Sequence, residues 1–205
     1  MRAEPVMEGV ASNLYFDKSF DLDAAKLMPG EFFVTERDMV LVTTLGSCVA
    51  ACIRDIRTGI GGMNHFMLPD GGDASSPTGT SARYGTYAME VVINELLKRG
   101  AKRHQLEAKV FGGGNVLASM TTINVGQRNA DFVLKYLAVE DIPVRARDLL
   151  EEFPRKVYFF PRTGKVLVKR LRDLHNGTLI TRESDYMQRI NRPQPTGGGE
   201  IELFA

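Results

Sequence analysis

Leu45-Gly46-Ser47-Cys48-Val49 is the stretch around which the sequence is organised. An apolar, β-branched segment at residues 39–45 precedes it, and a second apolar segment at residues 49–54 follows it. Glycine favours a sharp bend at the junction because it adopts backbone conformations that other residues avoid. The pattern therefore predicts two strands joined by a bend at Gly46 and Ser47.

A β-hairpin is predicted directly after this bend. Two apolar segments flank the turn-forming residues 55–59. If Arg54 faces Ile60 across this turn, Cys48 lies opposite a position close to His65. Directly opposed residues have Cβ atoms about 4.5–5.5 Å apart, so the thiol and the imidazole come within hydrogen-bonding reach of each other.

A cysteine beside a histidine is a chemically meaningful pair. The thiolate is the nucleophile, and an imidazole that takes the proton makes it available at neutral pH. We expect the bend to expose Cys48 and to aim the backbone N–H groups of Ser47 and Cys48 at an oxyanion. The alternative from the residues alone is that Cys48 is a small buried hydrophobe and His65 an ordinary strand histidine. Cys52 is predicted to lie in the core.

Composition narrows the class of protein. The 205 residues are 43% apolar and 25% charged, and the net charge of +1 gives no overall footprint for nucleic acid. Cys48 and Cys52 lie about 13 Å apart along a strand, too far for a disulfide. The three histidines are scattered and Cys-x-x-Cys is absent, which predicts no metal site. No apolar span of 18 residues is present, so we expect a cytoplasmic protein without membrane insertion.

Three regions are predicted along the chain: an N-terminal extension at 1–29 that wraps the domain, a main domain at 30–172 and a polar C-terminal tail at 173–205. The main domain alternates strands with two helices, the second of which is capped by Asn129. Adjacent hairpins argue against a regularly alternating parallel sheet, so the predicted class is α+β. The predicted strands are 31–35, 39–45, 49–54, 60–68, 106–111, 142–144, 156–160 and 165–169, and the predicted helices are 84–99 and 130–137.

Four motifs in this order resemble the CheD family of chemoreceptor glutamine deamidases. They are Thr-x-Leu-Gly-Ser-Cys-Val, Gly-Gly-Met-Asn-His-Phe-Met-Leu-Pro, Phe-Gly-Gly-Gly-Asn and Asn-Val-Gly-Gln-Arg-Asn. The resemblance covers roughly residues 30 to 172. It implies β-sheets flanked by helices, similar to the fold of cysteine-dependent toxin deamidases.

The resemblance also implies a Cys-His-Thr triad. Cys48 would be the nucleophile, His65 the general base and acid, and an upstream threonine the group that orients the imidazole. Thr43 and Thr44 are both candidates, and because strand neighbours point to opposite faces only one can reach His65. The motif spacing favours Thr43.

A second motif of the family supplies candidate substrate-binding residues. Asn124, Arg128 and Asn129 match it, and they would either line the substrate groove or fix a loop beneath it.

The implied activity is that of a protein-glutamine glutaminase, a hydrolase that converts glutamine side chains of methyl-accepting chemotaxis receptors to glutamate. Neither a metal nor an organic cofactor is implied. CheC, a phosphatase of the phosphorylated response regulator, is implied as a second partner. The alternative function is a non-catalytic chemotaxis adaptor that binds CheC or the receptor, and a related hydrolytic alternative is esterase action on glutamate methyl esters.

Overall fold

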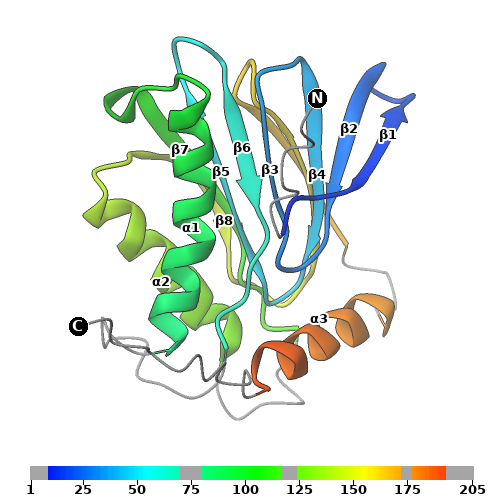
Figure 1. The fold of residues 1–205 in the computed structure, drawn as a ribbon. Coiled ribbons are helices and arrows are strands. Elements are labelled where there is room, and N and C mark those ends of the chain that lie inside the picture. Colours follow the sequence, from blue (N-terminus) through cyan, green and yellow to red (C-terminus); the bar gives the residue numbers. More distant parts are fainter. Residues whose placement is uncertain (1–8, 70–79, 117–123, 172–176, 193–205) are drawn as a thin grey trace, which may run out of the picture.

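Among the residues that the structure describes, two β-sheets and two α-helices form three layers, and a third α-helix closes one end of them (Figure 1). The helices are α1 (Thr80–Lys98), α2 (Val125–Val139) and α3 (Gly177–Ile190). The computed structural model describes residues 9–69, 80–116, 124–171 and 177–192.

The inner sheet lies between the helices and the second sheet. Its strand order is β3-β6-β5-β7-β8. All neighbouring strands are antiparallel except β7 and β8, which are parallel. The strands are β3 (Phe32–Thr35), β5 (Val49–Asp55), β6 (Gly61–Asn64), β7 (Leu106–Gly112) and β8 (Val144–Leu149).

The outer sheet has the order β1-β2-β4-β9-β10, with β2 and β4 parallel and the other neighbours antiparallel. Consecutive strands β4 and β5 therefore belong to different sheets, and the bend after Leu45 carries the chain from one sheet to the other. The strands are β1 (Asn13–Asp17), β2 (Leu22–Leu27), β4 (Met39–Leu45), β9 (Arg155–Phe160) and β10 (Lys165–Arg170).

Strand β5 is buried on both faces, which explains its continuous apolar sequence. Val49, Ala51 and Ile53 pack in the core shared with α1 and α2. Ala50 and Cys52 point the other way, into the core between the two sheets. The prediction that Cys52 is a core residue is confirmed, since 2% of it is exposed.

The α+β class is confirmed, and the strands expected at 31–35, 39–45, 49–54, 106–111, 156–160 and 165–169 are present, as is the first helix, which begins earlier, at Thr80. The strand expected at 60–68 is limited to Gly61–Asn64, and the prediction of a strand at 142–144 was wrong in position, since β8 is Val144–Leu149. In the hairpin Arg54 pairs with Gly61, and an isolated bridge joins Val49 to Phe66, so the register differs by one residue from the predicted one. Such a shift is within the freedom that turn type leaves to a hairpin. It leaves the start of β5 close to residue 65, as expected.

The start of the second helix was predicted wrongly. Helix α2 begins at Val125, and the N-cap is Asn124, whose side chain accepts a hydrogen bond from the Gln127 N–H at 3.0 Å. Gly126 obscured the start because glycine disfavours helices in water. In the fold it is required, because a Cβ there would lie 2.3 Å from the Gly113 carbonyl oxygen.

Parts of the predicted N-terminal extension and of the predicted C-terminal tail belong to the folded structure. Strand β2 pairs with β4 and buries Ala25 and Leu27 in the core between the sheets, so this part of residues 1–29 does not merely wrap the domain. Within the predicted tail at 173–205, residues 177–190 form α3, while 193–205 lie outside the described residues. The division of the chain into an extension at 1–29, a domain at 30–172 and a tail at 173–205 stays a prediction.

Candidate functional site

The bend between the sheets forms the centre of the site. Cys48 lies at its end, immediately before β5, and its backbone carbonyl accepts a hydrogen bond from the Gly113 N–H at 2.7 Å. Gly112 has a positive φ of 105°, and a Cβ on it would lie 2.2 Å from the Cys48 carbonyl oxygen. The glycine run after β7 is therefore needed for close backbone approach to the bend.

Thr43 and His65 meet between the sheets. The Thr43 Oγ1 lies 2.7 Å from the His65 Nδ1 and 2.9 Å from the Leu27 carbonyl oxygen. A carbonyl can only accept, so the single hydroxyl proton of Thr43 goes to Leu27. His65 must then carry its proton on Nδ1 and donate it to Thr43.

This arrangement fixes the histidine tautomer. The Nε2 of His65 is left with a lone pair, and it has no hydrogen-bond partner among the described residues although it is buried. An unprotonated, unpartnered ring nitrogen is the state required of a general base. The Thr43 hydroxyl therefore fixes the orientation of the imidazole, and its place in a catalytic triad stays a prediction.

Thr44 does not share this position. It pairs with Lys156 of β9, and its side chain is half-buried, unlike the fully buried Thr43. Because neighbouring strand residues alternate between faces, Thr44 lies on the side of β4 opposite to His65.

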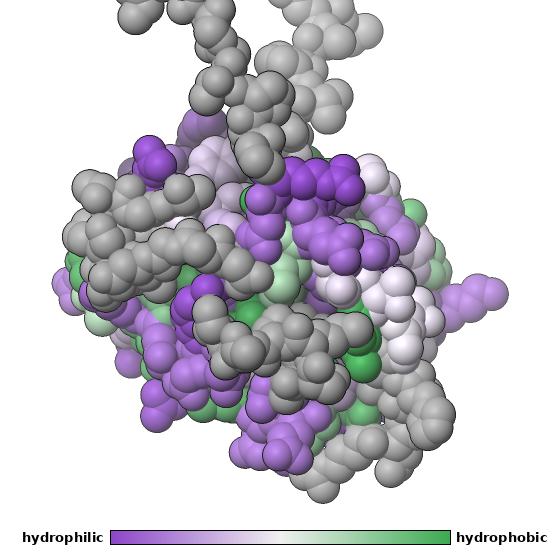
Figure 2. Space-filling view, turned by 90° about the horizontal axis from the view of Figure 1, so that it is seen from below, coloured by the Kyte–Doolittle hydropathy of each residue, from purple (hydrophilic) through white to green (hydrophobic). Residues whose placement is uncertain are grey.

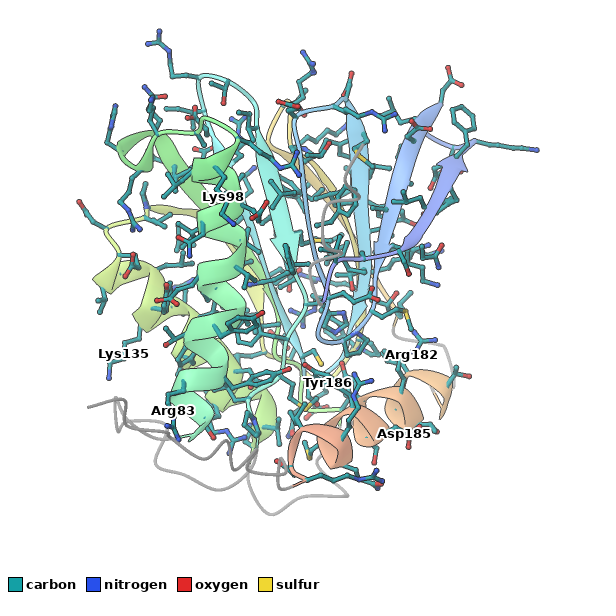
Figure 3. All side chains as sticks on the ribbon, in the orientation of Figure 1. Arg83, Lys98, Lys135, Arg182, Asp185 and Tyr186 are labelled. Carbon is teal, nitrogen blue, oxygen red and sulfur yellow. The ribbon has the colours of Figure 1, made fainter. Side chains whose placement is uncertain are left out.

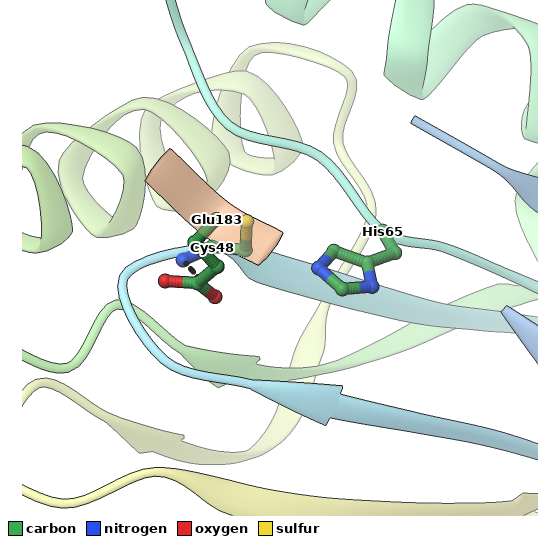
Figure 4. Close-up of side chains that lie close together, drawn as sticks. All are labelled: Cys48, His65 and Glu183. Carbon is green, nitrogen blue, oxygen red and sulfur yellow. Dashed lines mark hydrogen bonds between the residues drawn. The ribbon is translucent and has the colours of Figure 1, made fainter. Parts of the chain in front are cut away.

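A third functional group, Glu183 of α3, completes the cluster. The Cys48 Sγ, a ring nitrogen of His65 and a carboxylate oxygen of Glu183 lie within 4.8 Å of one another (Figure 4). All three residues are buried.

The Glu183 carboxylate is held by the bend. It accepts hydrogen bonds from the backbone N–H groups of Gly46 at 2.7 Å, Ser47 at 2.6 Å and Cys48 at 3.3 Å. Three consecutive amides that converge on one carboxylate form an oxyanion cradle. Ser47 and Cys48 were predicted to supply such donors, whereas Gly46 was not.

Burial determines the protonation state of the site. The pKa of the Cys48 thiol is raised well above its ordinary value, first by burial and then by the charge of Glu183. The pKa of His65 is lowered from 6.5 to about 3, chiefly by burial and with a smaller contribution from the charge of Arg182, while the Leu27 carbonyl acts in the opposite direction. At neutral pH the pair is therefore a thiol and a neutral imidazole.

The expectation of an exposed Cys48 is wrong for this structure. None of the residue is exposed, and 1% of His65 is exposed. The reason is α3, which covers the bend. The sequence analysis assigned the residues of this helix to the polar tail.

The motif residues of α2 contact the chain itself. Asn129 accepts from the Leu68 N–H at 2.9 Å and donates to the Ser47 carbonyl at 2.8 Å, and Arg128 donates to the carbonyls of Leu68 and Pro69. These contacts hold the loops beside the bend, and a role of the three motif residues in substrate binding stays a prediction. Asn124 caps the helix.

The cluster also offers a thiol, an imidazole and a carboxylate that could ligate a metal ion. The oxygens of Glu183 are, however, already engaged by three backbone amides. The geometry therefore fits the binding of an oxyanion or carboxylate better than that of a cation.

Glu183 is the functional residue that sequence reasoning missed. Its signal was a single carboxylate on the apolar face of an amphipathic helix, where Leu179, Tyr186 and Met187 are the buried neighbours. A buried carboxylate on such a face needs hydrogen-bond donors, but the sequence does not say which.

Comparison with known proteins places this geometry in context. The profile of the family described as CheD chemotactic sensory transduction matches residues 67–170. The probable chemoreceptor glutamine deamidase CheD of Methylobacillus flagellatus is 60% identical over 204 residues, which cover 98% of this chain and 100% of that protein. The chain belongs to the CheD family. Two further CheD proteins, from Janthinobacterium sp. (strain Marseille) and Thiobacillus denitrificans, are also 60% identical, over 99% and 97% of this chain and 100% and 98% of their own lengths.

The family profile begins after His65 and ends before α3, so it includes none of Cys48, His65 and Glu183. The matches to whole CheD proteins extend over nearly the entire chain and therefore include the bend and α3. None of the described helices is long and apolar enough to cross a membrane.

Proposed function

We propose that this chain hydrolyses glutamine side-chain amides on chemoreceptors to glutamate and ammonia, with Cys48 as the nucleophile. The observation that carries the proposal is the thiol of Cys48 beside a buried histidine whose Nε2 is kept unprotonated by Thr43. Relatives with 60% identity along their whole length are named probable chemoreceptor glutamine deamidases.

In the first half of the reaction, the His65 Nε2 takes the thiol proton and the sulfur attacks the amide carbon of the substrate. A C–S bond forms, and the amide oxygen becomes an oxyanion that accepts hydrogen bonds from the bend amides. The C–N bond then breaks, and the protonated Nε2 gives its proton to the leaving ammonia. A thioester remains on Cys48.

In the second half, the same nitrogen takes a proton from water, and the resulting hydroxide attacks the thioester carbon. The C–S bond breaks, the sulfur regains its proton, and glutamate is released. The net reaction consumes one water and releases one ammonia. Every proton transfer uses Nε2, which is why the tautomer set by Thr43 matters.

A groove of about 770 Å³ supplies a route toward His65. The groove is lined by residues 28–32, by Tyr84 and Tyr87 of α1 and by Tyr186 of α3. Aromatic side chains at the rim of a groove are typical of surfaces that bind protein segments. We infer that the receptor approaches through this groove.

The test is incubation of the purified chain with a receptor cytoplasmic fragment, followed by ammonia release and peptide mass analysis. The wild-type protein should convert specific glutamines, and Cys48→Ala should convert none. Cys52→Ala is the matched control, because Cys52 is a buried thiol in the core that takes no part in the reaction, and it should retain activity. Equal product with and without Cys48 would refute the proposal.

The adaptor alternative is favoured by one observation, the complete burial of Cys48. An adaptor would bind the receptor fragment without altering its mass. A receptor fragment that carries glutamate methyl esters separates esterase action from deamidation in the same assay, since methanol rather than ammonia is released.

A cytoplasmic location belongs to the same proposal, and both cysteines are unpaired, as expected for a reducing compartment. From the resemblance we also infer binding to CheC. Co-purification of the chain with CheC tests that partner separately from the catalytic assay.

A further inference from the structure

Helix α3 lies directly over the nucleophile. In Figure 1 it crosses the end of the sheets at which the chain passes from β4 to β5. Leu179, Glu183, Tyr186 and Met187 form its buried face, and Tyr186 and Met187 pack in the same core cluster as Cys48.

The opposite face of α3 is polar. Asp185 and Arg189 are exposed, and on this end of the molecule hydrophilic side chains predominate on the described surface (Figure 2). Figure 3 shows Tyr186 directed toward the strands and Asp185 away from them. The helix is therefore amphipathic, with the glutamate placed on the face that contacts the site.

Glu183 occupies the position that the proposed reaction needs. Its carboxylate uses the N–H groups of Gly46, Ser47 and Cys48, which are the donors available for the oxyanion. A substrate oxygen and the Glu183 oxygens cannot use these donors together. A glutamate carboxylate is also the chemical product of glutamine deamidation.

Two further features fit α3 to this position. The Tyr186 hydroxyl is hydrogen-bonded to the Tyr84 hydroxyl of α1. Gly46 lacks the side chain that would exclude the glutamate, because a Cβ there would lie 2.7 Å from the Glu183 Oε2. Both features bring the helix close to the bend.

We propose that α3 is an internal product mimic: Glu183 fills the oxyanion cradle and shields Cys48, and α3 must leave the bend before a substrate glutamine can react. The proposal rests on the proposed function for the identity of the displaced substrate. With α3 docked, the site is the neutral thiol and imidazole pair described above. Departure of α3 also removes Arg182, whose charge opposes protonation of His65.

Thiol alkylation tests the docked helix without any receptor. Iodoacetamide and peptide mass mapping give separate rates for Cys48 and Cys52 in the full chain. In Glu183→Ala we expect Cys48 to react at least about tenfold faster than in the wild type, because the cradle no longer holds α3 and a buried thiol becomes accessible. Cys52 should stay unreactive in both.

Asp185→Ala is the matched control, since it removes a carboxylate from the exposed face of the same helix, and it should behave as the wild type does. Equal Cys48 rates in wild type and Glu183→Ala would overturn the proposal. The same variants in the receptor assay separate the two hypotheses. If Glu183→Ala is alkylated faster at Cys48 but no variant deamidates the receptor, the proposal for α3 stands and the proposed enzymatic function is refuted. If the receptor is deamidated but the alkylation rates are equal, the proposed function stands and the proposal for α3 is refuted.

A second variant, Glu183→Gln, keeps the shape of the side chain and presents an amide to Cys48. If residue 183 occupies the substrate position, its side chain should be hydrolysed slowly to glutamate, detected as the mass gain of amide-to-acid conversion. The double variant Glu183→Gln with Cys48→Ala should keep its amide. An unchanged amide at position 183, in a protein whose Cys48 is as protected as in the wild type, would refute product mimicry.

Discussion

Thr43 and Thr44 are chemically identical neighbours, and strand geometry alone separates their roles. Residues 43 and 44 point to opposite faces of β4, so one hydroxyl reaches the His65 Nδ1 and the other does not. The alternation of the two side chains could be predicted from the sequence, but the face of β4 that meets His65 could not. Strand β4 belongs to the outer sheet, whereas His65 follows β6 of the inner sheet.

Thr43→Val should lower kcat by roughly 10²-fold, the lower end of what general acid–base catalysis contributes, because the imidazole loses the acceptor that fixes its tautomer. KM should be unchanged, since Thr43 contacts the histidine and the Leu27 carbonyl. Receptor deamidation kinetics measure both constants. Thr43→Ser keeps the hydroxyl and should retain most of the wild-type kcat. Thr44→Val should change kcat little. An unchanged kcat in Thr43→Val would remove Thr43 from the triad.

His65 also makes stability depend on pH. Its pKa is about 3 in the folded protein because it is buried, against 6.5 ordinarily. As the pH falls from 6.5 toward 3, the unfolded chain binds a proton that the folded chain does not, so the free energy of unfolding decreases by up to about 1.4 kcal/mol per pH unit from this group. Above pH 6.5 this loss is absent.

Urea unfolding at several pH values measures the effect. The stability of His65→Gln should fall less steeply between pH 6.5 and 3 than that of the wild type. Parallel curves for wild type and His65→Gln would contradict the assigned burial effect.

At the scale of elements, α2 supports the site without supplying a reacting group. Asn129 joins two loops, since it satisfies both the Leu68 N–H and the Ser47 carbonyl. The family resemblance implied that this motif lies beside the proposed site. In the structure, the Asn129 side chain holds the backbone of the bend, whose amides donate to Glu183.

Asn129→Ala should destabilise the protein by about 1–3 kcal/mol for each of the two buried backbone groups that it leaves unsatisfied. Deamidation should fall with it, because the Ser47 amide loses its fixed position. Denaturant unfolding and the receptor assay measure the two effects. Gln127→Ala, an exposed change on the same helix, is the control and should alter stability by less than about 0.5 kcal/mol. Full stability of Asn129→Ala would show that these contacts are dispensable.

The elements themselves were largely predictable where the hydrophobic pattern was strong. Strands β4, β5, β7, β9 and β10 and helix α1 all follow apolar periodicity bounded by turn formers. Helix α3 was missed because its polar surface dominates the composition. Its structure depends on a buried face whose partner lies far away in the sequence.

At the scale of the whole molecule, one buried arginine joins the sheets beside the site. Arg155 of β9 is fully buried and donates to the backbone carbonyls of Gly112, Asp148 and Leu150, which belong to or follow strands of the inner sheet. It also pairs with the Asp148 carboxylate at 2.9 Å. The bend therefore lies next to a buried polar network that connects the two sheets.

Arg155→Ala should lower the free energy of unfolding by about 3–5 kcal/mol, because it leaves buried carbonyls and a partly buried carboxylate without their partner. Denaturant unfolding measures the change. Arg170 forms an ion pair with the same aspartate, but its side chain is 51% exposed. Arg170→Ala should therefore lower the free energy of unfolding by at most about 1 kcal/mol. Similar costs for both variants would refute the distinction between the buried and the exposed pair.

The sequence by itself determined the local parts of this protein: the strands with a strong apolar pattern, the bend at Gly46 and the short-range hairpin that brings His65 to the start of β5. These follow from residue conformational preferences and periodicity, which act over a few residues. Only the tertiary structure decided that β4 and β5 separate into two sheets and that Glu183, 135 residues away from Cys48, fills the cradle. The physical reason is that a buried carboxylate can be satisfied by any well-placed amides, and which amides are available depends on how the finished layers pack.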